Sequence, residues 1–72
     1  MQKLNSLELS NKAHERLAKK HSEIYKKTES GNSWIKSGYH NTVLRSQKEL
    51  KRKLTLEEKK KHYKSASHYY YN

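Results

Sequence analysis

The chain has 72 residues, of which 17 are Lys or Arg and seven are Glu, and its formal net charge is +10. So short a chain has room for one small domain. Positive charges in such excess repel one another within a small domain, and binding to a polyanion offsets that repulsion most readily. Nucleic-acid phosphates are the commonest polyanions that a soluble protein meets.

The composition excludes several classes of protein. Cys is absent, which rules out disulfides and thiolate metal sites. No apolar run approaches the roughly 20 residues of a membrane span. The first residues, Met1–Ser6, lack the apolar segment of a signal peptide. We therefore expect a cytoplasmic protein or, if a phage encodes it, one of the host cytoplasm or nucleoid. The Lys-, Asn- and Tyr-rich, proline-free composition is typical of AT-rich genomes such as those of viruses and phages.

The aliphatic content is low, with eight Leu, two Ile and one Val. This lies below the fraction of about 20% under which high net charge begins to indicate disorder. We expect the isolated chain to be marginally stable and to become ordered with a partner.

The first predicted element is a helix over residues 6–28. Asn5 is a suitable N-cap, with Glu8 three residues later as its reciprocal partner. An apolar stripe then follows at helical spacing, formed by Leu9, Ala13, Leu17, His21 and Ile24. Gly31 is expected to end the helix.

Residues 29–41 are predicted to be a connector. The segment contains both glycines, Gly31 and Gly38, and the single Trp34. Ser33 is a possible cap for one helical turn, and an ordered loop is the alternative.

A second helix is predicted over residues 42–54, capped by Asn41. Its narrow apolar stripe consists of Val43, Gln47, Leu50 and Leu54. Arg45, Lys48 and Arg52 lie on the opposite side at spacings of three and four.

A third helix is predicted over residues 55–70. Thr55-Leu56-Glu57-Glu58 matches a capping box, which favours a bend near Thr55. The alternative is one long helix over 42–70. The predicted fold is all-α, either a helical hairpin or an irregular three-helix unit. Its seam is expected to comprise Leu9, Leu17, Ile24, Val43, Leu50, Leu54, Leu56 and Tyr63.

The C-terminal half carries the densest positive charge, which makes it the candidate nucleic-acid surface. The residues concerned are Arg45, Lys48, Lys51, Arg52, Lys53, Lys59, Lys60, Lys61 and Lys64. Because 14 of the 17 basic residues are Lys, contact with the phosphate backbone is favoured over reading of base edges. The alternative is a solvated face that contacts nothing specific.

Aromatic residues are interleaved with this charge. Candidates for base stacking or for a partner interface are Trp34, Tyr39, Tyr69, Tyr70 and Tyr71. Tyr25, Tyr63 and Tyr70 are expected in the core or at a partner interface. The run of three tyrosines near the C-terminus indicates burial against a partner.

The sequence predicts no metal, no cofactor, no small-molecule substrate and no catalytic residue. His14 and His21 share a predicted helix face, but no third ligand joins them at ligand spacing. A nucleophilic Cys, an Asp and a Gly-rich phosphate loop are all absent, so we do not expect an enzyme. The junction at Leu54–Thr55 is a weak match to a helix-turn-helix. The apolar stripes lack the bulk of a membrane-surface helix.

These observations favour a small non-enzymatic nucleic-acid-binding protein, with RNA slightly preferred over DNA, that acts within a larger ribonucleoprotein or nucleic-acid machine. The second hypothesis is a protein-binding adaptor or inhibitor. It would dock its basic helices and tyrosine tail on an acidic surface of a nucleic-acid enzyme or ribosome. A structural filler that neutralises packaged nucleic acid is a third.

Overall fold

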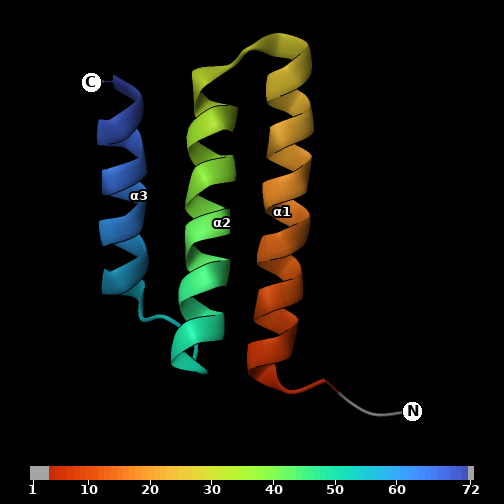
Figure 1. Cartoon of the computed structure of the whole chain (residues 1–72), viewed down its shortest axis with the longest axis vertical. Coiled ribbons are helices and arrows are strands. Elements are labelled where there is room, and N and C mark those ends of the chain that lie inside the picture. The colour runs from red at the N-terminus through yellow and green to blue at the C-terminus, as the bar shows by residue number, and fades with distance from the viewer. Residues whose placement is uncertain (1–3, 72) are drawn as a thin grey trace.

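The computed structural model describes residues 4–71, with side chains for residues 4–68. It contains three α-helices: α1 (Ser6–Thr28), α2 (Gly31–Leu50) and α3 (Leu56–Tyr71). The helices lie side by side, each antiparallel to the next, with α2 in the middle (Figure 1). Within the described residues there is no strand. The all-α prediction is confirmed.

α1 has the predicted bounds and the predicted N-cap. The Asn5 side-chain oxygen accepts a hydrogen bond from the Glu8 backbone N–H at 2.8 Å, and the Asn5 amide donates to the Glu8 carboxylate at 3.0 Å. The end of the helix differs from the prediction. Glu29, and not Gly31, adopts the left-handed conformation (φ 54°), and its N–H donates to the carbonyl of Tyr25.

The predicted connector is mostly helix, so its predicted extent was wrong. α2 begins at Gly31, and only Glu29 and Ser30 separate it from α1. Glycine, serine and asparagine are weak helix formers, and packing against the rest of the molecule overrides that weakness. Ile35 is 2% exposed and Ser33 is also buried.

α2 ends at Leu50, four residues earlier than predicted, and the chain then reverses direction. Lys51 takes the left-handed conformation (φ 57°) and donates its N–H to the carbonyl of Gln47. The capping box is confirmed. The Glu58 N–H donates to Thr55 Oγ1 at 3.2 Å, and the Thr55 N–H donates to Glu58 Oε1 at 2.9 Å. A single helix over 42–70 is therefore excluded.

The interface between α1 and α2 is more polar than the predicted seam. Val43 and Leu54 are buried as expected, but Leu9 is 56% exposed and Leu50 is 50% exposed. The buried side chains are Ala18, Ile35, Val43 and Leu54 together with His14, Ser33 and Gln47. On α1 the buried positions His14 and Ala18 are each one residue after a position of the predicted stripe.

Hydrogen bonding explains this shift of the α1 face. Gln47 Nε2 donates to Ser10 Oγ at 3.2 Å and to Asn11 Oδ1 at 2.9 Å, and the Leu54 N–H donates to Gln47 Oε1 at 3.1 Å. A buried amide without partners costs about 1–3 kcal/mol. Burying Leu9 instead would gain a similar amount, about 1.5–3 kcal/mol. The arrangement found satisfies the amide at both ends, and Leu9 stays exposed.

α3 packs against α2 alone. Within the described residues, no α-carbon of α3 lies within 8 Å of one in α1. The molecule measures 40 × 26 × 16 Å, a shallow layer of three helices in place of a closed bundle (Figure 1). A layer has two broad faces, and no other element of residues 4–71 covers either of them.

Replacement of Gln47 tests the buried amide. We expect Gln47→Ala to lower the free energy of unfolding by about 2–4 kcal/mol, because it creates a cavity and leaves the buried Leu54 N–H without its acceptor. Gln47→Met fills the volume and isolates the loss of hydrogen bonding, so it should cost less but remain destabilising. Urea denaturation followed by circular dichroism measures both. A Met variant as stable as the parent would contradict the role given to the hydrogen bonds.

Gly38 offers an independent test of the packing. It lies inside α2 without a positive φ, and a Cβ built there meets nothing within 4 Å. We expect Gly38→Ala to raise the free energy of unfolding by about 0.5–1 kcal/mol, the usual helix-propensity difference. Urea denaturation measures the change. A loss of stability would contradict the open space found around the Cβ position of residue 38.

Candidate functional site

Three of the predicted cations gather around one groove between α2 and α3. The groove has a volume of about 630 Å³. Most of its lining consists of Tyr39 from α2 and Leu56, Lys59, Lys60, Tyr63 and Lys64 from α3. Ser67 and His68 also line it, and among the described residues no carboxylate contributes. We call this site the lysine groove.

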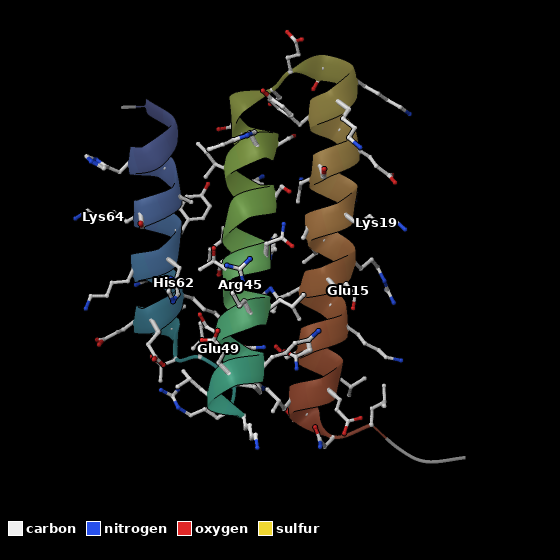
Figure 2. All side chains as sticks on the ribbon, in the orientation of Figure 1. Glu15, Lys19, Arg45, Glu49, His62 and Lys64 are labelled. Atoms are coloured by element: carbon white, nitrogen blue, oxygen red, sulfur yellow. The ribbon has the colours of Figure 1, made fainter. Side chains whose placement is uncertain are left out.

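The other predicted basic residues of the helices lie elsewhere. Arg45 and Lys48 line a separate shallow hollow with Glu49. Arg45 and Glu49 of α2 lie on the same face of the layer (Figure 2). The two hollows face opposite ways: Asn41, which lines the Arg45 hollow, follows Tyr39 by two positions and so points about 200° away around α2. Lys61 is exposed on α3 outside the groove lining.

The α2–α3 loop holds three further predicted cations, and two of them have partners within the chain. Arg52 forms a bidentate ion pair with Glu58, with N–O distances of 2.9 and 3.0 Å. Lys53 Nζ donates to Ser6 Oγ at the start of α1, at 3.0 Å. Lys51 is the C-cap of α2. This loop therefore serves the fold, and the groove lysines are the better candidates for contact with a ligand.

Glu58 holds the loop together electrostatically. The hydrogen bond from the Arg52 guanidinium, followed by the one from the Thr55 backbone N–H, lowers the pKa of the Glu58 carboxyl to about 2. Its contribution to folding is complete above its ordinary pKa near 4.5 and is lost only as the pH falls below that value.

The predicted aromatic residues are divided between the faces of the layer. Tyr39 lines the lysine groove, whereas Trp34 lies beside Gly38 in the hollows on the other side of α2. Tyr63, which was expected in the core, is 40% exposed in the groove, and Leu56 is 69% exposed there. The spacing of Leu56, Lys60, Tyr63 and Lys64 on one helix face was the signal that could have revealed this site.

The side chains of Tyr69, Tyr70 and Tyr71 lie outside the described residues. Their predicted role at a partner interface stays a prediction.

Three histidines form a cluster between α1 and α2 beside the groove. His14 Nδ1 and His40 Nδ1 are 2.9 Å apart, and the ring of His21 stacks on that of His40 with centroids 5.9 Å apart. The sequence spacing did not reveal this cluster, because the unpredicted first half of α2 brings His40 to His14 and His21. Among the described residues, however, no group of three His, Cys, Asp or Glu side chains is arranged to hold a metal ion.

The cluster disfavours protonation. Burial, with the neighbouring His14, His21, Lys36 and Lys59, lowers the pKa of His40 to about 4. Burial and Lys59 lower the pKa of His14. The 2.9 Å contact requires one ring nitrogen to accept a hydrogen bond, which two protonated imidazoles cannot do.

Tyr39 joins this cluster to the groove. Its ring packs against His40 at 4.8 Å and edge-to-face against Tyr63 at 5.3 Å. Burial raises the pKa of Tyr39. The exposed ring of Tyr63 therefore rests on a fixed neighbour, which is itself held by the α1–α2 interface.

The pairing of α2 with α3 differs from a helix-turn-helix. The two helices run antiparallel and side by side (Figure 1), whereas that motif joins its helices at about 90–120°. Of the helices described, none combines the length and apolarity needed to cross a membrane.

Compared with known proteins, the chain matches no family model, no curated protein and no solved structure.

The histidine cluster generates a prediction about pH. The folded pKa of His40 lies below its ordinary value of 6.5, so the unfolded chain binds more protons at mildly acidic pH. Stability is then complete above about pH 6.5 and falls as the pH decreases toward about 4. We expect a lower Tm at about pH 5 than at about pH 7.5, a range in which Glu58 stays ionised. His40→Gln should reduce this difference. A Tm that does not fall between the two pH values would contradict the prediction.

Proposed function

We propose that this chain is a non-enzymatic nucleic-acid-binding protein that contacts phosphates through the lysines of α3. The observation that carries the proposal is the lysine groove: Lys59, Lys60 and Lys64 line it and no carboxylate does. Lysine ammonium groups meet phosphates as mobile point charges, which supports backbone contact with little sequence preference.

The distribution of charge supports this assignment of the binding face. Glu15, Glu23 and Glu49 line the shallow hollows on the opposite face, beside basic neighbours such as Lys19 and Arg45. Figure 2 shows Glu15 and Lys19 along α1 and Arg45 and Glu49 along the neighbouring helix α2. The positive charge there is partly offset by carboxylates in the same hollows, whereas no carboxylate of the described residues lines the lysine groove.

RNA is the preferred ligand within this proposal. Readers of duplex DNA commonly place a recognition helix in the major groove, and the antiparallel α2–α3 pair lacks that geometry. Tyrosines beside lysines suit RNA, whose recognition commonly involves stacking on aromatic side chains. As the sequence suggested, we expect the chain to act as one component of a larger ribonucleoprotein or nucleic-acid machine.

The test compares two double variants that each remove two positive charges. Lys60→Gln with Lys64→Gln changes the groove, whereas Lys12→Gln with Lys27→Gln changes exposed positions of α1. We expect the groove variant to weaken binding of single-stranded RNA and to lower the log–log salt slope by about 0.7 for each phosphate that a lysine no longer neutralises. The α1 variant should keep the parental slope. Fluorescence anisotropy between about 50 and 200 mM salt measures both quantities.

Equal effects of the two double variants would contradict the proposed binding face. Weak parental binding to RNA and DNA at about 150 mM salt would contradict nucleic-acid binding itself. The adaptor hypothesis, with an acidic protein as partner, would then take its place.

A further inference from the structure

The lysine groove contains more apolar surface than phosphate contact requires. Leu56 is 69% exposed and Tyr63 is 40% exposed, and both line the groove. The two side chains lie seven residues apart, which is two turns along the same face of α3. Phosphates would be held equally well by lysines on a polar helix, so the apolar surface beside these lysines is available for a second kind of contact.

We propose that the groove receives an unpaired base of a single-stranded nucleic acid. The base stacks on Tyr63 beside Leu56, while Lys60 and Lys64 hold the phosphates on either side. This inference rests on the proposed function and adds the form of the nucleic acid.

The position of the lysines relative to the ring supports this arrangement. Lys60 lies about one turn before Tyr63 on the same face of α3, and Lys64, about 100° further around the helix, also lines the groove. A strand that laid its base on Tyr63 would bring its neighbouring phosphates to these ammonium groups. Proteins that bind single strands combine such a basic groove with aromatic side chains.

The Tyr63 ring is pre-organised for stacking. Tyr39 packs edge-to-face against it at 5.3 Å, and Tyr39 is in turn held against His40 and His14, at 4.8 and 6.5 Å. Little side-chain freedom is therefore lost when a base arrives. The groove volume of about 630 Å³ falls within the range of about 300–1,000 Å³ typical of small-ligand sites, so a base has room.

Other polyanions fit this groove less well. A duplex keeps its bases stacked inside and offers mainly phosphates to a lysine-lined surface, which would leave Leu56 and Tyr63 unused. An acidic peptide could pair its carboxylates with the lysines, so a Glu-rich peptide is included among the ligands tested.

The experiment measures anisotropy with oligouridine, oligothymidine, a mixed-sequence DNA duplex and the Glu-rich peptide. We expect Tyr63→Leu to weaken binding of both single strands by at least about five-fold and to change duplex binding by less than about two-fold. Tyr63→Phe, which keeps the ring, should restore single-strand binding. Tyr25→Leu, on the opposite side of the layer, is the aromatic control. Oligouridine and oligothymidine differ in both the sugar and the C5-methyl group of the base, and selective loss of binding to both single strands supports the inference.

A second variant guards against a folding defect in Tyr63→Leu. Leu56→Ser alters an exposed side chain, should leave the helical circular dichroism unchanged, and should weaken single-strand binding selectively. If both variants leave the ratio of single-strand to duplex affinity unchanged while the Lys60/Lys64 variant weakens all ligands, the inference fails and the proposed function stands. If no nucleic acid binds and the Glu-rich peptide does, both fail.

Discussion

The arrangement of the three helices depends on one buried amide, the side chain of Gln47. It is fully buried and makes hydrogen bonds to α1 through Ser10 and Asn11 and to the α2–α3 loop through Leu54. Both polar ends of the amide are satisfied, and a satisfied buried polar group favours one specific packing over its alternatives. The amide fixes where α1 lies against α2 and where the chain turns toward α3. The position of the lysine groove follows from that turn.

A polar interface of this kind suits a chain with few aliphatic residues. His14, Ser33 and Gln47 occupy positions that apolar side chains fill in most small domains, and Leu9, Leu50 and Leu56 are exposed instead. Residues 4–71 form no second row of helices under which these leucines could be buried. The exposed apolar surface is therefore a consequence of the single-layer arrangement of the helices. At the lysine groove this apolar surface lies beside lysines, and no carboxylate of the described residues lines the groove.

Local signals predicted the parts of the fold that local interactions decide. The two capping boxes, Asn5 with Glu8 and Thr55 with Glu58, marked the starts of α1 and α3 because each is completed within four residues. The start of α2 at Gly31 could not be predicted, since its weak helix formers are held by packing against α1. The α1 face was misassigned for the same reason: its partner Gln47 lies 36 residues away from Asn11. At the candidate site, the lysines were found by their charge, whereas Tyr63 and Leu56 were taken for core because burial depends on neighbours that the sequence does not reveal.

Among the described residues, α-carbons of α3 come within 8 Å of α2 and not of α1, so the three helices form an approximately linear array, with Lys59 of α3 acting on His14 of α1 only through its charge. Stability in such an array is a sum of nearest-neighbour terms, so the ends can open while the middle stays folded. α3 is the end with fewer buried side chains: in its described part, residues 56–68, none is fully buried. α3 would therefore detach from α2 by local unfolding, which requires less free energy than unfolding of the whole molecule. A ligand bound between α2 and α3 would add contacts to α3 that no second helix supplies. The affinity for that ligand would then depend on the fraction of molecules in which α3 is folded against α2.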